Sequence, residues 1–246
     1  MLPQSSIQNS NSKLDQHTRT TVERPLVTKG FQVFVHGVVE GAECDEASSL
    51  FARTQLFFGP DWSFLSLPTT KDGSSNLNDS NVVYTTYSHN AEVITQLSDR
   101  STGPFANFVW AAPFEFALHS TNPHGWPQLI VTLHTITSKP LNVVAHRAYG
   151  RDLDCRDAIV GYSRCFVPMQ SGHHSRQLSI MQLENATKKH QLISFLTREA
   201  PVLRDVSYIC RGDDRVVLTT RPVSGYVKLT FVVMIQGMSS CGFDDS

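Results

Sequence analysis

The chain has 246 residues, of which 40% are hydrophobic and 17% are charged, and its formal net charge at pH 7 is -1. This length suits one large domain or one domain with tails, and the apolar content excludes a wholly disordered chain. The 21 basic residues are balanced by 22 acidic ones, so no excess of positive charge exists to wrap a nucleic-acid duplex, and we expect no nucleic-acid partner.

The beginning of the chain and its cysteines favour a reducing compartment. Residues 1–28 are rich in Ser, Asn, Gln and Thr and contain no apolar core, so we expect a disordered tail rather than a secretory signal. No run reaches the roughly 18 apolar residues that a membrane-spanning helix needs. The five cysteines are widely spaced and form no C-x-x-C motif, which predicts reduced core thiols rather than a zinc site.

Alternation of apolar and polar residues, which is typical of half-buried strands, follows along the chain. The clearest strands are predicted at residues 31–36, 50–58, 108–118, 129–134, 160–166, 177–183 and 226–235. Pro113 cannot donate a ladder hydrogen bond, so its strand should lie at a sheet edge or contain a bulge. Residues 66–90 are polar and rich in turn residues, which predicts a long, mobile loop.

A single helix is predicted after residue 185. Asn185 or Thr187 can cap its beginning, and Pro201 stops it. Apolar residues recur at helical spacing, and basic residues fall outside that face. The apolar residues are Leu192, Phe195 and Leu196, and the basic residues are Lys188, Lys189 and Arg198. About eight strands, turn-rich connections and this short helix predict an all-β fold, an antiparallel β-sandwich.

The sequence carries no fingerprint of catalysis, since the nucleophile-elbow, P-loop, zincin and dinucleotide-binding motifs are all absent. We therefore predict no catalytic residues, no metal ligands and no cofactor. One alternative is calcium binding by three aspartates in a single loop, Asp152, Asp154 and Asp157. Because Arg151 and Arg156 can neutralise this cluster, we expect a solvated loop with local ion pairs.

A basic group around the helix is the candidate binding surface. If the strand before the helix packs beside it, the group forms one patch suited to anionic lipid headgroups or an acidic partner. The alternative is an ordinary solvated face, because two neighbouring histidines on a strand point to opposite faces and make a poor metal site. The candidate lipid- or partner-binding residues are His173, His174, Arg176, Lys188 and Lys189.

The segment 120–127 predicts a turn followed by a fixed strand entry. Asn122-Pro123 and Gly125 are turn residues, and Trp126-Pro127 leads into the next strand. Trp126 is costly to expose, so we expect either a plug over one end of the sandwich or an interface anchor.

Three segments resemble the B9 domain family: STNPHGWPQLIVTL at 120–133, GFQVFVHGVVEGAE at 30–43 and FFGPDW at 57–62. The resemblance extends over almost the whole chain after the tail. It implies a C2-like form of the β-sandwich in a B9 domain at 29–243, with loop insertions near 63–90 and 135–148. It also implies that the protein is not an enzyme.

The resemblance further implies a function at the base of the cilium. Family members are components of the ciliary transition zone, so the expected location is the cytoplasm, cytoskeleton, basal body and transition zone. The expected partners are B9 domain-containing protein 2, the Meckel syndrome type 1 protein and members of the tectonic-like complex. The expected function is a non-enzymatic scaffold subunit for cilium assembly, the diffusion barrier and ciliary signalling such as Hedgehog. The alternative is a peripheral phospholipid-binding module that docks on an anionic membrane surface.

Overall fold

The computed structural model describes residues 30–69, 83–86, 92–102, 107–139, 154–197, 200–212 and 218–243; the expected tail at 1–28 lies outside them. The strands are β1 (Phe31–Cys44), β2 (Ser49–Phe57), β3 (Trp62–Phe64), β4 (Ser66–Thr69), β5 (Val83–Thr86), β6 (Glu92–Ile94), β7 (Ser98–Asp99), β8 (Asn107–Ser120), β9 (Gln128–Lys139), β10 (Asp154–Phe166), β11 (Gly172–Leu183) and β12 (Thr220–Gln236). The helices are α1 (Lys188–Thr197) and the 3₁₀ helices η1 (Val206–Cys210) and η3 (Ser239–Cys241).

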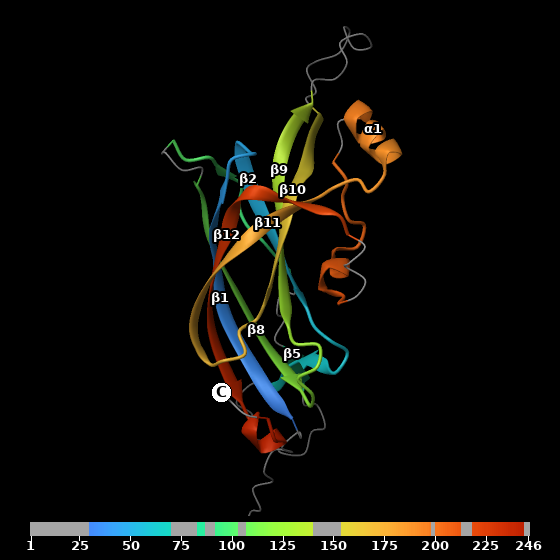
Figure 1. The fold of residues 1–246 in the computed structure, drawn as a ribbon. Helices are drawn as coiled ribbons and strands as arrows, with labels where there is room; N and C mark the ends of the chain where they lie inside the picture. Colours follow the sequence, from blue (N-terminus) through green and yellow to red (C-terminus); the bar gives the residue numbers. More distant parts are fainter. Residues whose placement is uncertain are drawn as a thin grey trace, which may run out of the picture.

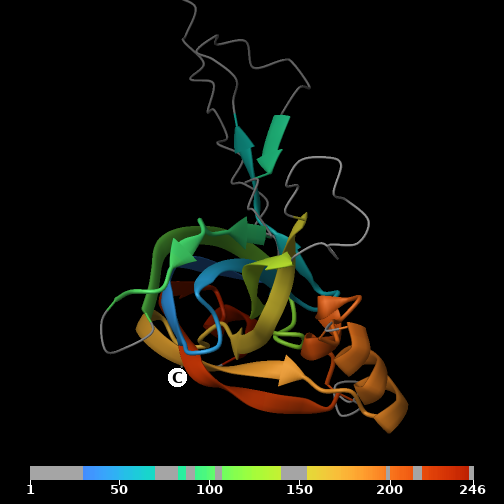
Figure 2. The same ribbon diagram turned by 90° about the horizontal axis from the view of Figure 1, so that it is seen from above.

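Ten strands form one curled antiparallel sheet in the order β3-β8-β1-β12-β11-β10-β9-β2-β6, with β7 beside β2. One link is much weaker than the others: β10 and β11 share the single pair Tyr162–Met181, whereas β11 pairs with β12 along its whole length. The sheet therefore divides into two halves that enclose a core. Figure 1 shows the two halves from the side, and Figure 2 shows them from above. The expected antiparallel all-β fold is confirmed, and it is consistent with a C2-like arrangement.

The core forms because each long strand places every second side chain inward. In β12, Phe231 and Val233 are buried, while Val232 between them and Met234 beyond them are exposed. On one side, Trp110 of β8 connects the two halves through a hydrogen bond. Its indole N–H donates to the carbonyl of Leu50 in β2 at 3.3 Å.

Pro113 lies in the middle of β8, opposite Val38 of β1. The neighbouring strand β3 pairs only with the end of β8, so no strand of the described residues pairs with the other side of Pro113. The register also shifts between Val39 and Gly41, and Ala111 in the same region has a φ of 48°. The prediction of an edge or bulged strand at Pro113 is confirmed.

Two loop predictions need correction. Within 66–90, β4 and β5 pair with each other as a separate two-stranded sheet, in line with the β-branched and aromatic residues of the β5 sequence. Within 135–148, residues 135–139 continue β9 and pair with the beginning of β10. Thr135, Ile136 and Thr137 are β-branched, which favours this extension. The strand count exceeds eight because β3 to β7 are too short to show an alternating pattern.

Candidate functional site

The predicted basic group does not form one patch. His173, His174 and Arg176 lie near the beginning of β11. Lys188 and Lys189 are the first residues of α1, beyond the end of that strand. A strand rises about 3.3 Å per residue, so the part of β11 after Arg176 alone separates the two groups by about 23 Å. The strand is longer than the segment 177–183 predicted from sequence, and this length divides the group into two.

The polar side of helix α1 faces the short segment that immediately precedes the helix. Thr187 caps its beginning, since the Thr187 hydroxyl accepts a hydrogen bond from the His190 N–H at 3.3 Å. The amide of Asn185 donates to the Ser194 hydroxyl at 2.8 Å. The Asn185 carbonyl accepts from the Gln191 side chain at 3.1 Å. These contacts hold one side of the helix against the segment that precedes it.

The apolar side of α1 points outward. Leu192, Phe195 and Leu196 are 59%, 79% and 71% exposed, and no described residue of the helix is buried. At 3.6 residues per turn, Gln191 and Ser194 lie on the side opposite Leu192 and Leu196. The helix itself is confirmed. Lys188 and Lys189 lie on the outside as expected, but the apolar residues are also exposed, because the polar side faces the preceding segment.

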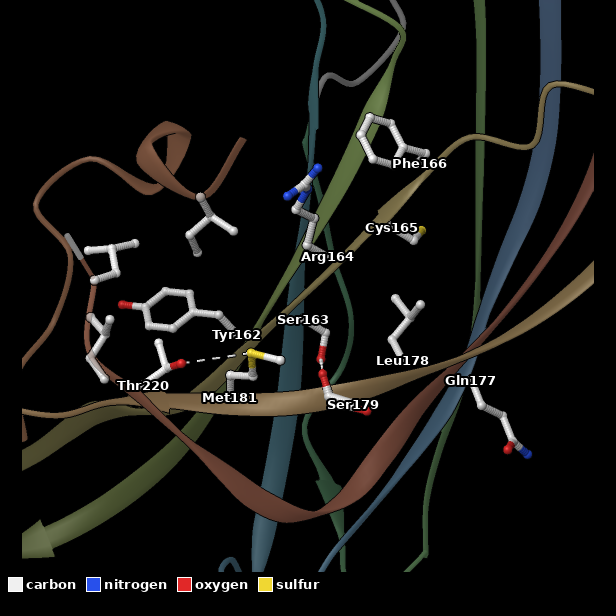
Figure 3. A pocket seen from close by; sticks show the side chains of 13 residues that line it. Tyr162, Ser163, Arg164, Cys165, Phe166, Gln177, Leu178, Ser179, Met181 and Thr220 are labelled. Carbon is white, nitrogen blue, oxygen red and sulfur yellow. Dashed lines mark hydrogen bonds between the residues drawn. The ribbon is translucent and has the colours of Figure 1, made fainter. Parts of the chain in front are cut away.

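A groove of about 710 Å³ opens along the junction of β10 and β11. Its walls come from β10 and β11, with further residues from η1 and the beginning of β12. In Figure 3, Ser163 and Ser179 face each other across the junction, where the Ser163 hydroxyl donates to the Ser179 carbonyl at 3.0 Å. Cys165 and Leu178 lie on one side of this hydrogen bond, and Met181 lies on the other. The lining is thus mainly apolar, with polar groups at the centre.

The electrostatics of the groove combine an apolar floor with a cationic rim. Arg164 donates through Nε to the Gln128 side chain at 2.7 Å, and its guanidinium lies 4.7 Å from the centre of the Phe166 ring. Burial raises the pKa of the Cys165 thiol to about 12, an effect that the nearby charge of Arg176 opposes. The thiol is therefore neutral at physiological pH and belongs to the apolar floor.

Trp126 occupies the end of the sandwich where β1 begins. It is 4% exposed, and its indole N–H donates to the carbonyl of Val167 at 2.8 Å. Its ring stacks on Phe31, with centroids 6.4 Å apart, and meets Trp62 edge to face. This burial favours the plug over the interface anchor. The contribution of Trp126 to stability stays a prediction.

The structure gives a partial view of the three aspartates considered for calcium. Asp152 and the side chain of Asp154 lie outside the described part of the chain. Asp157 has a carboxylate oxygen 3.3 Å from Nδ1 of His134. Burial lowers the pKa of His134, and the charge of Asp157 opposes this shift. Among the residues that the structure describes, no group of three His, Cys, Asp or Glu side chains could hold a metal ion.

Sequence reasoning did not identify the groove. It arises between β10 and β11. The alternation of apolar and polar residues predicts each strand by itself, but it does not predict that the two strands diverge. One signal in the sequence could have indicated the groove: Phe166 and Met181 are large apolar residues that face outward, and both are about half exposed. Within the described ranges, no helix is long and apolar enough to cross a membrane.

Comparison with known proteins gives consistent matches. The family described as "Ciliary basal body-associated, B9 protein" (B9-C2) matches residues 33–234. The chain is 27% identical over 214 residues to "B9 domain-containing protein 1" of Homo sapiens, a match that covers 87% of this chain and 86% of the human protein. The protein of the same name from Xenopus laevis is 25% identical over 87% of this chain and 89% of its own length. No solved structure matches.

Proposed function

Because the chain belongs to the B9-C2 family of ciliary basal body-associated proteins, we propose that it is a non-enzymatic scaffold subunit of the transition-zone complex. In this role it supports cilium assembly, the ciliary diffusion barrier and signalling such as Hedgehog. Its proposed partners are B9 domain-containing protein 2, the Meckel syndrome type 1 protein and members of the tectonic-like complex. Its proposed location is the basal body and transition zone, within the cytoplasm and cytoskeleton.

The outward-facing apolar side of α1 is the observation that carries this proposal. Large apolar side chains gathered on one exposed helix face are typical of a surface that another molecule covers. Phe195 and Leu196 are the most exposed of them. A scaffold needs such surfaces, whereas an enzyme needs converging acid, base or nucleophile groups in a concave site. The groove at β10 and β11 is lined by one charged residue, Arg164, and by no acid–base pair among its described residues.

Co-purification from ciliated cells tests the proposal. We expect the tagged wild-type protein to retain B9 domain-containing protein 2 and the Meckel syndrome type 1 protein, and the double variant Phe195→Ser, Leu196→Ser to lose at least one of them. Met234→Ser is the matched control, because Met234 is a similarly exposed apolar residue on β12. Equal recovery of the partners with all three proteins would exclude α1 as a docking surface. Failure of the wild type to retain either partner would overturn the scaffold role.

A second candidate function is peripheral binding to an anionic membrane, and the charges of α1 favour it. Lys188 and Lys189 stand exposed at the beginning of the helix, where positive charge is unfavourable for the helix dipole. The helix contains no acidic residue. An exposed apolar face flanked by lysines is suited to the interface of a bilayer. Each lysine near an anionic leaflet contributes about 1 kcal/mol of attraction, which salt screens.

Vesicle sedimentation separates the two functions. We expect a lipid-binding module to sediment with vesicles containing phosphatidylserine but not with phosphatidylcholine vesicles. The variant Lys188→Gln, Lys189→Gln should then sediment less, while its recovery of the protein partners is unchanged. If the wild type sediments with neither vesicle and still retains its partners, α1 docks on protein alone.

A further inference from the structure

The junction of β10 and β11 is the open edge of the sandwich. β10 pairs with β9 along its length, and β11 pairs with β12 along its length, but the two strands share only the Tyr162–Met181 pair. From this pair toward Phe166 and Gly172 the strands diverge, and no described strand pairs with their facing edges. Backbone groups along a strand edge that lacks a neighbour are a template for pairing with another chain.

The groove lies along this open edge and gives a partner side chain a place to bind. Its volume of about 710 Å³ is within the range of binding pockets. Cys165 and Leu178 are inner residues that it reaches, since both contribute to or pack against the main core. Phe166 and Met181 form its exposed apolar rim. An apolar side chain entering here would bury surface on core residues that the open edge leaves accessible.

Between Tyr162 and Phe166 of β10 and between Gly172 and Met181 of β11, the described charged side chains are Arg164 and Arg176. Arg164 lies on the β10 side, where Phe166 and Gln128 hold it. Arg176 of β11 is exposed but is paired with Leu229 of β12, so it lies on the inner face with Leu178 and does not line the groove. The groove has no acidic residue in its described lining, so its complement is a negatively charged segment.

We propose that this open edge binds an extended segment of a partner protein in which apolar and acidic residues alternate. The segment pairs as an added strand with the free edge of β11, places an apolar side chain beside Cys165 and Leu178, and places carboxylates toward Arg164. An extended strand suits the site because successive side chains point to opposite faces, so one segment can place apolar side chains on the inner face beside Leu178 and acidic side chains on the outer face toward Arg164. This inference rests on the proposed scaffold function, and names a second docking surface distinct from α1.

A peptide titration tests the site directly. The probe is a fluorescently labelled seven-residue peptide that alternates valine and glutamate, and its anisotropy is measured with the full chain. We expect it to bind, and the same peptide with lysine in place of glutamate not to bind. Arg164→Glu should weaken binding of the glutamate peptide by about tenfold or more, because it replaces an attraction by a repulsion. Lys189→Glu is the control, since it makes the same charge change on α1 and should leave the affinity unchanged.

Methylation of the peptide backbone distinguishes strand addition from simple charge attraction. N-methyl groups on alternate residues remove the N–H donors on one edge of an extended peptide. We expect methylation of one set of alternate residues to abolish binding and methylation of the other set to be tolerated. Equal binding of both methylated peptides would overturn strand pairing. Equal binding of the glutamate and lysine peptides would overturn the assigned charge complementarity.

Two further arms identify the class of occupant and separate this site from the scaffold role. Loss of sedimentation with phosphatidylserine vesicles in Arg164→Glu, with no peptide binding by the wild type, would assign the open edge to lipid and overturn the proposal. In co-purification, the site alone is overturned if the wild type retains its partners and Arg164→Glu also retains all of them. A wild type that retains none overturns the scaffold function itself.

Discussion

The indole rings of Trp62 and Trp126 meet edge to face, with centroids 5.1 Å apart and planes at 85°. Both N–H groups are satisfied by backbone carbonyls, that of Trp62 by His124 and that of Trp126 by Val167. Phe31 packs against both rings. The end of the sandwich is therefore closed by an aromatic cluster drawn from three segments far apart in the chain, and this cluster is held in place by hydrogen bonds to the main chain.

We predict that Trp126→Ala destabilises the protein by about 3–5 kcal/mol, the usual cost of removing a large buried aromatic side chain. The reason is the loss of its packing on Phe31 and Trp62 together with an unsatisfied carbonyl at Val167. Urea unfolding measures the change. Trp126→Phe, which keeps a ring but loses the N–H, should cost less. Unchanged unfolding combined with lost partner binding would show that Trp126 is an interface anchor instead.

We predict that Gly125→Ala destabilises the turn before Trp126. Gly125 has a φ of 70°, and a Cβ atom there would lie 2.5 Å from the Cα atom of Gly59. The two glycines are also joined by a hydrogen bond from the Gly59 N–H to the Gly125 carbonyl at 2.8 Å. Both the backbone strain and the clash should contribute, giving a loss of more than about 1 kcal/mol.

Gly242→Ala is the matched control for this prediction. Gly242 has a similar φ of 83°, but a Cβ atom there meets nothing within 4 Å. Gly242→Ala therefore carries the backbone strain without the clash and should cost less than Gly125→Ala. Equal free energies of unfolding for the two variants would contradict the importance of the close approach to Gly59.

We predict that the apolar face of α1 contributes almost nothing to the stability of the isolated chain. Phe195→Ser should change the free energy of unfolding by no more than about 0.5 kcal/mol, as is usual for surface substitutions. Leu229→Ala in the core should cost about 2–5 kcal/mol under the same conditions. A loss of similar size for Phe195→Ser would mean that this side chain packs against the protein, contrary to its exposure of 79%.

The long strands could be predicted from sequence because each has one buried face. The alternation of apolar and polar residues along the strand indicates that face directly. The same reasoning failed for α1. A helical repeat shows that Leu192, Phe195 and Leu196 share one face, but it does not show whether that face meets the protein or the solvent. The hydrogen bonds of Asn185 decide the orientation, and they depend on where the chain leaves β11.

The groove could not be predicted for a different reason. In β10 the register shifts between Ile159 and Gly161, so Val160 joins the core whereas Tyr162 faces outward and accepts a hydrogen bond from the Leu203 N–H at 3.1 Å. A single inserted residue thus changes which side chains face the neighbouring strand. Such a shift leaves the apolar content of the strand unaltered, and the sequence pattern does not reveal it.

His134 gives the fold a predicted dependence on pH. The imidazole is buried and stacks on Phe51, with ring centroids 4.9 Å apart. Burial lowers the pKa of His134 below its ordinary value of 6.5, and the Asp157 carboxylate acts in the opposite direction without cancelling the effect. The unfolded chain, with the higher pKa, therefore binds more protons than the folded chain once the pH falls to this range.

The contribution of His134 to the free energy of unfolding should be constant above pH 6.5 or so. It should fall as the pH drops from about 6.5 toward the lower pKa of the folded state, and level off below it. Comparing urea unfolding at pH 7.5 and pH 5 measures this fall. Asp157→Asn should deepen it, because the interaction that supports the protonated imidazole is lost. His134→Phe, which keeps a flat ring beside Phe51 but cannot titrate, should reduce it. A fall of equal size in the wild type and in His134→Phe would show that other groups control the acid sensitivity.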